Sequence, residues 1–501
     1  MRSIRPTIGG FVVALILATA PVRAQQQQQQ PGQQPEPDTQ QGQDQNQNQN
    51  QENPTEPIPA IRSPLAGAAD NGQTNIDQDA IQPDTNSITG VERVGIGAPA
   101  MTHNYWAPRL AIAGTADSNP NYEVGSSDWA GWFSILGGVD LHRSSGGSDL
   151  LLYYTGGGTF TNANDVDSGI IQELSLKDRF LFHRSTFTVF EQLQYLPESS
   201  LGFAGAAGAG IPGVGGGIGV GTGYTPGQSL LVPRGQNLSS STAGEWDYQV
   251  SPRTSITLVG SYSLLHYFDN DLANYGNAGF QAGFNYRISR LDTVAISYQF
   301  SAIRYSNLGQ SINTNTVQGV YSRRITGKLG LQISAGPQFV TSNTPITSTG
   351  STTPTATSYS SLYWTLNANA TYAFRRATLV ASYSHGLTGG SGLLVGAETD
   401  IVTGTLSGRI SRATNAGVSF GYARNNGLGV GTTADYLTYD YWFAGANWTR
   451  TIGRSLDVFA NYQFQHQNNS TTGCTGTACG QGILRSEITV GVNIHKQPIP
   501  F

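Results

Sequence analysis

The chain has 501 residues, of which only 12% are charged and 10% are aromatic, and its formal net charge is -5. Soluble domains carry about 25% charged residues, so a much lower value indicates a surface on which charge is costly, such as one facing lipid. A mean hydropathy of -0.26 argues against a helical membrane protein, and the slightly acidic balance gives no reason to expect nucleic acid as a partner.

Residues 1–24 have the three parts of a secretory signal peptide. Arg2 and Arg5 form a basic start, an apolar run covers residues 11–18, and Val22 and Ala24 place small residues before a cleavage site. The apolar run is too short to cross a bilayer as a helix, which takes about 20 residues, and this disfavours the alternative of a membrane anchor. No later stretch reaches that length, so a membrane location has to come from strands.

Residues 25–103 form a low-complexity segment. Glutamine dominates its first half, and proline, aspartate and glycine dominate the second, with few aromatic residues. Such a composition cannot bury enough apolar surface to offset the entropy lost on ordering. We therefore predict a disordered periplasmic leader, with a tether to a periplasmic partner or to the cell wall as the alternative.

From residue 104 to residue 501 the chain alternates between apolar and polar side chains. Within residues 293–300, Val294, Ile296 and Tyr298 fall on one side, while threonine, alanine, serine and glutamine fall on the other. Successive side chains of a strand point to opposite faces, so the pattern predicts strands with one apolar and one polar face. The same alternation returns over residues 361–374, 455–466 and 485–495.

Connections between the predicted strands alternate in length, as they do in bacterial outer-membrane barrels. Short polar turns occur at residues 251–254, 289–292, 326–328, 375–376, 411–412 and 452–454, and long ones at 341–358, 387–396, 424–434 and 467–482. We predict an all-β fold, a transmembrane antiparallel up-and-down barrel of about 18 strands, with 16 as the alternative. The predicted cores are residues 107–115, 129–141, 149–156, 169–177, 185–195, 243–250, 254–266, 278–288, 292–303, 313–323, 328–340, 361–374, 377–386, 398–409, 414–424, 436–449, 455–466 and 485–495. A soluble β-sandwich would leave too much apolar surface exposed to water.

One long connection, residues 196–236, is rich in glycine and alanine. By position it is the third long loop, the one that folds into the lumen in general porins, so it is a candidate constriction; a mobile surface loop is the alternative. Its candidate residues are Gly202, Phe203, Gly205, Gly208, Gly210, Gly213 and Gly217. It contains no Gly-Lys-Ser or Gly-Lys-Thr, so it is not a phosphate loop.

Aromatic and basic residues gather at opposite ends of the predicted strands. Rings near the loop ends predict a girdle at the boundary between water and lipid. They are Tyr262, Tyr298, Phe300, Tyr383, Phe420, Tyr422, Tyr462 and Phe464. The basic residues at the short turns are Arg253, Arg290, Arg323, Arg324, Lys328, Arg375, Arg376, Arg412 and Arg454. We interpret both sets as boundary markers.

The chain has two cysteines, Cys474 and Cys479, within one predicted loop. A close pair in an exported protein predicts a local disulfide in preference to a metal site.

The chain ends at Phe501. A terminal phenylalanine resembles the signal by which the barrel-assembly machinery recognises outer-membrane proteins. Pro498 and Pro500 depart from that signal because proline cannot donate to a strand ladder, so we expect the last strand to end near His495 with a short tail after it. Taken together, the signal peptide, residues 104–495 and Phe501 resemble porin-like outer-membrane barrels of Gram-negative bacteria, including those linked to polysaccharide-export operons.

The predicted inward positions are mostly threonine, serine, asparagine, glutamine and glycine, with scattered charges such as Glu398, Asp457 and Glu487. A barrel of this size encloses an aqueous channel, so we expect passive diffusion of small hydrophilic solutes through a neutral polar lumen. A non-conducting structural or surface-interaction barrel and a barrel associated with polysaccharide export are the alternatives. The expected partners are outer-membrane lipid, the barrel-assembly machinery and small solutes.

The seven histidines are scattered over the chain without a nucleophile and an orienting group close by in sequence, so we expect no enzyme. Likewise we expect no catalytic, cofactor or metal-binding residue. The sequence identifies neither the solute nor an oligomeric state.

Overall fold

The computed structural model describes residues 104–120, 129–161, 169–196, 236–268, 274–306, 309–346, 355–388, 396–428, 438–469, 482–496 and 498–501. The signal peptide, the glutamine-rich leader, the glycine-rich connection and the cysteine pair lie outside these ranges, so what the sequence predicts about them stays a prediction. Within the described ranges, no helix has the length and the apolar character needed to cross a bilayer.

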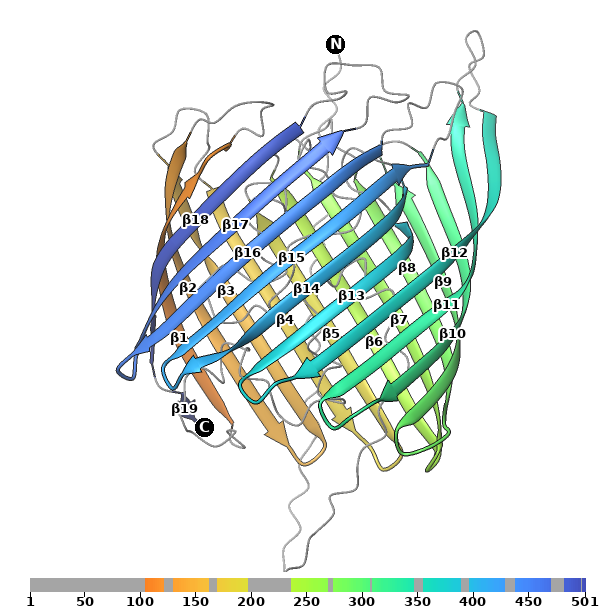
Figure 1. Ribbon diagram of the computed structural model, residues 1–501, viewed down its shortest axis with the longest axis horizontal. Coiled ribbons are helices and arrows are strands. Elements are labelled where there is room, and N and C mark those ends of the chain that lie inside the picture. Colours follow the sequence, from red (N-terminus) through yellow and green to blue (C-terminus); the bar gives the residue numbers. More distant parts are fainter. Residues whose placement is uncertain are drawn as a thin grey trace, which may run out of the picture. The chain divides into compact units, whose positions relative to one another are not determined.

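The described chain forms one antiparallel sheet of 18 long strands that closes into a barrel (Figure 1). Each strand pairs with the next along the chain, and β1 (Tyr105–Asp117) also pairs with β18 (Gly482–His495). Closure pairs both edges of the sheet, as a bilayer requires of strands that span it. The predicted count of 18 and the up-and-down order are confirmed. The other long strands are β2 (Ala130–Ser145), β3 (Ser148–Thr161), β4 (Gly169–Leu181), β5 (Ser185–Leu196), β6 (Asn237–Ser251), β7 (Thr254–Tyr267), β8 (Tyr275–Arg287), β9 (Asp292–Tyr305), β10 (Ser311–Arg324), β11 (Leu329–Ile346), β12 (Thr355–Ala373), β13 (Ala377–Thr388), β14 (Ala397–Ser411), β15 (Thr414–Gly427), β16 (Thr438–Ile452) and β17 (Leu456–Asn469).

Burial alternates along the strands and separates the two faces of the sheet. On β18, Leu484 and Val490 are 50% and 52% exposed, whereas Arg485 and Thr489 are 1% and 5% exposed. In a closed sheet the exposed row lies outside and the covered row faces the lumen. The outside is therefore apolar and the inside polar, as the alternation in the sequence predicts.

The predicted aromatic girdle lies on the outer face. Tyr298, Phe420 and Tyr462 share the outward row of their strands with Ile296, Val418 and other exposed apolar residues. Rings in this position can rest between hydrocarbon and water.

Short turns join the strands at one end of the barrel, and side-chain hydroxyls hold several of them. Ser289 Oγ accepts hydrogen bonds from the backbone N–H groups of Leu291 and Asp292, at 3.0 and 3.1 Å. In the turn between β10 and β11, Thr326 Oγ1 likewise accepts hydrogen bonds from two backbone N–H groups. In the turn between β16 and β17, Gly453 has a φ of 73°, a conformation that other residues rarely adopt.

The short tail after β18 rejoins the sheet. β18 ends at His495, as expected, but Ile499 and Pro500 form a short strand β19 (Ile499–Pro500) that pairs with Trp106 and Tyr105. The prolines do not prevent this, because the hydrogen bonds come from their neighbours. Lys496 N–H donates to the carbonyl of Pro108, and Phe501 N–H donates to the carbonyl of Asn104, both at 3.2 Å.

Glu398 faces outward, and the prediction that it points inward is wrong. It has the same parity on β14 as Val402 and Leu406, which are 41% and 39% exposed. The prediction placed Glu398 inward because it is polar. Side chains of a strand alternate between the two faces of the sheet, so position along the strand decides the face. Asp457 and Glu487, also predicted inward, do face the lumen and are 7% and 8% exposed.

Candidate functional site: the lumen wall

Neutral hydrogen-bonding side chains line the lumen from β8 to β12, away from the strand ends. They bond from strand to strand: Ser301 Oγ of β9 donates to Asn277 Oδ1 of the neighbouring β8 at 2.7 Å, and Gln318 Nε2 of β10 donates to Thr365 Oγ1 of β12, across β11. Buried polar groups need such partners, so each side chain fixes the next around the wall. This arc has the amide- and hydroxyl-rich character that the sequence predicts.

Arg109 carries charge into the lumen wall near the short-turn end of β1. Its guanidinium forms an ion pair with Asp140, and Nη2 donates to Thr155 Oγ1 at 2.7 Å. The side chains of Arg109 and Asp140 are 3% and 5% exposed. Gly138, directly opposite Arg109, makes this possible, because a Cβ there would lie 2.6 Å from Arg109 Nε.

Three further ion pairs lie at the same end of the barrel. His142 Nε2 lies 2.8 Å from Asp149 Oδ1, and Arg179 Nη2 lies 3.6 Å from the other oxygen of that carboxylate. On the other side of Arg109, His495 Nε2 lies 3.3 Å from Asp457 Oδ2. Together with Arg109 and Asp140, these pairs form an arc across β17, β18, β1, β2, β3 and β4.

Another charged group lies at the loop end of the same strands. Arg485 Nε donates to Asp117 Oδ2 at 2.7 Å, and Arg485 Nη2 lies 3.5 Å from Glu487 Oε2. Asp117 Oδ1 also accepts a hydrogen bond from the backbone of Asn119 at 2.9 Å. Both members of the main pair are almost completely covered, at 1% and 0% of side-chain surface. The lumen wall therefore has a neutral arc from β8 to β12 and an arc from β17 to β4 on which charged groups form ion pairs.

The sequence did not reveal the pair of Asp117 and Arg485, because the two residues are far apart in the chain. Asp117 and Arg485 are 368 residues apart and meet only because β18 closes the sheet against β1. Once the register between β1 and β18 is known, the inward charged residues of β1 can be matched with those of β18 and β2. No local spacing in the sequence carries that signal.

Closure, an apolar outer face and a polar inner face decide the class of the molecule. The described part of the chain is a transmembrane antiparallel β-barrel.

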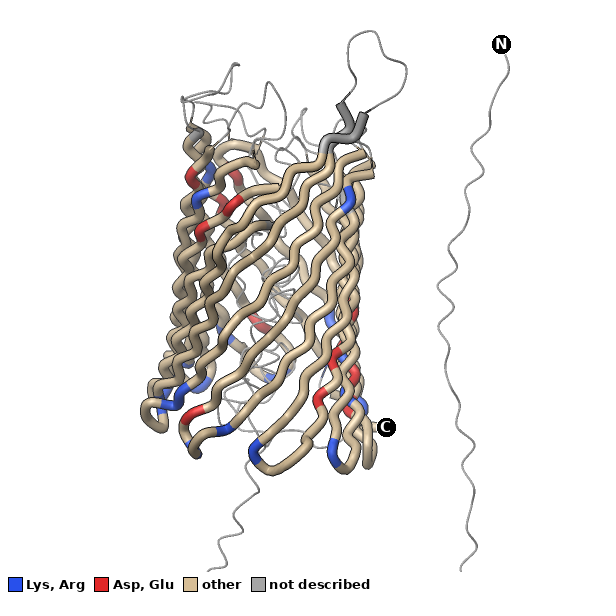
Figure 2. The backbone as a smooth tube through the Cα atoms, turned by 90° about the vertical axis from the view of Figure 1, so that its right-hand side faces the viewer, with Lys and Arg blue, Asp and Glu red and all other residues tan. Residues whose placement is uncertain are grey.

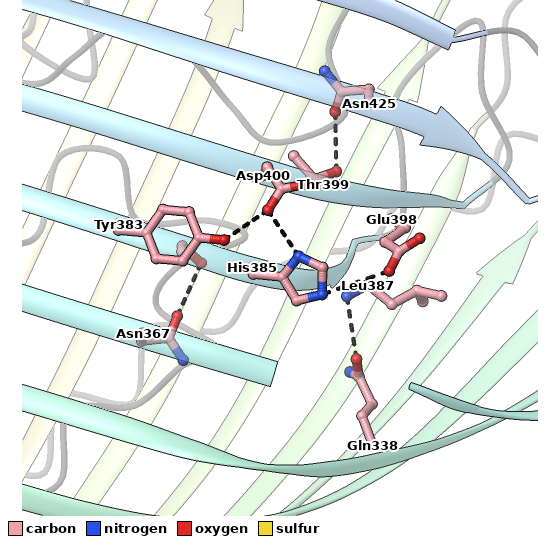
Figure 3. Close-up of polar contacts among 10 residues, drawn as sticks. Gln338, Asn367, Tyr383, His385, Leu387, Glu398, Thr399, Asp400 and Asn425 are labelled. Atoms are coloured by element: carbon pink, nitrogen blue, oxygen red, sulfur yellow. Dashed lines mark hydrogen bonds and ion pairs between the residues drawn. The ribbon is translucent and has the colours of Figure 1, made fainter. Parts of the chain in front are cut away.

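A second polar cluster lies on the outer face of the barrel at the loop end (Figure 3). His385 Nδ1 lies 2.8 Å from Asp400 Oδ1, and its Nε2 lies 3.5 Å from Glu398 Oε1. The Tyr383 hydroxyl donates to the same Asp400 oxygen at 2.8 Å. Trp364 stacks on the imidazole with ring centroids 3.9 Å apart, which leaves His385 only 6% exposed.

Both ring nitrogens of His385 face carboxylates, so neither is directed at a serine or threonine hydroxyl as the base of a hydrolase would be. In the part of the chain that the structure describes, no group of three histidine, cysteine, aspartate or glutamate residues has metal-binding geometry. We interpret the cluster as a brace across β12, β13 and β14.

Of the predicted site residues, only Phe501 falls within the described ranges. It follows β19, and its side chain is 62% exposed. Cys474, Cys479 and the glycines of residues 202–217 lie outside them.

No protein-family model matches this chain, and no curated protein matches it. Among solved structures, the barrel is similar to the outer-membrane protein OpdK from Pseudomonas aeruginosa, with a TM-score of 0.39 and 9% identity over 78% of this chain and 99% of that one. For OpdQ from Pseudomonas aeruginosa the TM-score is 0.39 and the identity 10%, over 79% of this chain and 98% of that one. For the ferric-catecholate import receptor Fiu from E. coli K12 the TM-score is 0.40 and the identity 9%, over 79% of this chain and 82% of that one. Likenesses of this degree say nothing about a solute, and the fold assignment rests on the register of the strands.

Proposed function

We propose that this barrel is a passive channel for small hydrophilic solutes. The observation that carries the proposal is the polar inner face of a closed sheet of 18 strands. Barrels of 16 to 18 strands are wide enough to leave an aqueous path inside. The wall offers hydroxyl and amide groups on one arc and a mixture of acidic and basic groups on the other, so we expect only a weak preference for ions of one sign.

We further propose that the short turns face the periplasm. Residue 104 enters β1 at the short-turn end, and β18 and β19 end there too, so the leader and the chain end lie on the same side of the membrane. We also propose that the barrel-assembly machinery recognises Phe501 and that Cys474 and Cys479 form a disulfide.

Swelling of liposomes in sugar solutions of increasing size tests the channel. Chain reconstituted in its folded form should admit small sugars and exclude large ones, whereas heat-unfolded chain should admit none. Gln299 and Phe300 offer a matched pair, because Gln299 lies on the inward row of β9 and Phe300 on the outward row. Gln299→Trp should slow the largest permeant sugars, and Phe300→Trp should leave the rates unchanged.

One observation favours a second candidate, a non-conducting structural barrel. Several lumen-facing side chains have almost no exposed surface, among them Asp117 and Gln281 at 0% and Arg485 at 1%. If the lumen is closed at these residues, liposomes that contain the folded protein should not swell with a sugar of any size.

The glycine-rich connection stays a prediction from the sequence. If residues 200–224 narrow the lumen, their deletion should raise both the size limit for sugars and the conductance. Unchanged values would place the segment outside the path of the solute.

A further inference from the structure

The short turns between β6 and β17 share a two-part composition. Each places an exposed apolar side chain at the end of a strand and a basic side chain beside it. In the turn between β8 and β9, for example, Ile288 is 53% exposed and Arg290 follows it; in the next turn but one, Phe374 is 48% exposed and precedes Arg375. The apolar residues of the six turns are Val250, Ile288, Leu291, Ile325, Phe374, Ile410 and Ile452, which are 45% to 63% exposed.

Nine cations with exposed side chains lie in these turns or on the outward row beside them. We call this set the basic rim: Arg253, Arg290, Arg323, Lys328, Arg375, Arg376, Arg412, Arg450 and Arg454. Among the described residues, Asp292 is the carboxylate on the outer side of this rim, and it is already engaged, 3.6 Å from Arg323 and hydrogen-bonded by Tyr321 and Ser289. The rim therefore has a large excess of positive charge.

The loop end of the same strands does not share this excess. Among the residues that the structure describes, its outer face carries Glu398, Asp400 and Asp440, with Arg304 and Arg424 as the Lys or Arg side chains. Figure 2 shows blue Lys and Arg positions at the turns at the bottom of the tube, with red Asp and Glu positions among and above them, and both signs near its top. The positive charge belongs to one rim of the barrel.

We propose that the basic rim binds the headgroups of anionic phospholipids in the leaflet at the short-turn end. The exposed apolar side chains reach the acyl boundary, while the cations lie beyond it at the level of the phosphates. Eight of the nine cations are arginines, whose planar guanidinium can bind two phosphate oxygens at once. Neighbouring turns are two strands apart, so these sites recur about every 10 Å along the rim.

This inference requires only that the barrel spans a bilayer. It does not depend on whether the lumen conducts, so its failure would leave the proposed channel unaffected.

Lipid selectivity is measured with spin-labelled lipids and full-length mature chain reconstituted in phosphatidylcholine vesicles. The readout is the association constant of labelled phosphatidylglycerol relative to labelled phosphatidylcholine, taken from the immobilised lipid component. Wild-type barrel should prefer phosphatidylglycerol several-fold, and the preference should disappear at about 1 M salt, where screening acts over about 3 Å.

The test variant is the triple replacement Arg290→Gln, Arg375→Gln and Arg454→Gln, which removes one cation from each of three turns. It should reduce the preference for phosphatidylglycerol at least threefold. The matched control removes the loop-end cations by Arg304→Gln and Arg424→Gln and should keep the wild-type preference.

An equal association of both lipids with the wild-type barrel would overturn the proposal. So would the same preference in the wild type and the triple variant, or an equal loss in the loop-end control. The wild-type salt titration needs no variant and decides the first of these outcomes by itself.

Discussion

Tyr383 donates its phenolic hydrogen bond to Asp400 Oδ1 at 2.8 Å, from a ring on the outward row of β13. Tyr422 and Asp440 repeat the arrangement two strands further on, at 2.7 Å. In both pairs the ring belongs to the aromatic girdle and the carboxylate lies towards the loop end. A tyrosine can thus keep its ring against lipid while its hydroxyl satisfies a charge at the boundary.

Tyr383→Phe keeps the ring and removes this hydrogen bond. We expect a loss of about 1–2 kcal/mol in the free energy of unfolding, because the acceptor is ionised and partly covered. Urea unfolding of the barrel in lipid vesicles measures it. Tyr462→Phe is the matched control: Tyr462 faces outward on β17 opposite Ala446 and Ile488, and its replacement should cost much less.

Arg109 and Asp140 should behave as a coupled pair. Arg109→Leu leaves the Asp140 carboxylate covered and without its cation, so we expect a loss of about 3–5 kcal/mol. Adding Asp140→Leu removes the uncompensated charge and should recover most of that loss. In a double-mutant cycle of unfolding free energies, a loss in the double variant equal to the sum of the losses in the two single variants would show that the pair is not coupled.

Gly138 should tolerate no side chain. A Cβ there would lie 2.6 Å from Arg109 Nε and 2.7 Å from the carbonyl oxygen of Tyr154, and backbone cannot move aside easily. Gly138→Ala should therefore destabilise the barrel by about 1–3 kcal/mol. Gly114, on the outward row of the neighbouring β1, has nothing within 4 Å of such a Cβ, so Gly114→Ala should be close to neutral.

Glu191 is a carboxylate on the outward row in the middle of β5, with Val189 and Leu193 on either side of it. Ser240 and Thr242 of β6 donate hydrogen bonds to its two oxygens. Charge at this depth is costly, so Glu191→Gln should raise the free energy of unfolding by about 1 kcal/mol in vesicles. A marked loss of stability would show instead that the ionised form is required on this face.

The sequence was sufficient for the strands, because each strand of a membrane barrel has to alternate over its whole length. All 18 predicted cores overlap the observed strands, and the last of them ends at His495 as expected. The main differences are at strand ends. β6, for instance, starts at Asn237, ahead of its predicted core, because Ser239, Ser240 and Ser241 conceal the alternation.

Pairing across the sheet was much harder to predict. The ladder that joins β1 to β18, and with it the contact of Asp117 with Arg485, depends on closure and leaves no periodic mark in either segment. Glu398 could have been placed correctly, because the outward series Val402, Gly404, Leu406 continues back to it in steps of two. The return of the chain end to β1 depends on hydrogen bonds beside two prolines, which propensity alone disfavours.

Single-channel recording of the refolded mature chain in a planar bilayer tests the central claim most directly. A polar lumen inside 18 strands predicts stable conductance steps that grow in proportion to salt concentration, with little preference between cations and anions. Folded protein that inserts in the bilayer and produces no steps would contradict a passive channel and make the structural barrel the better account.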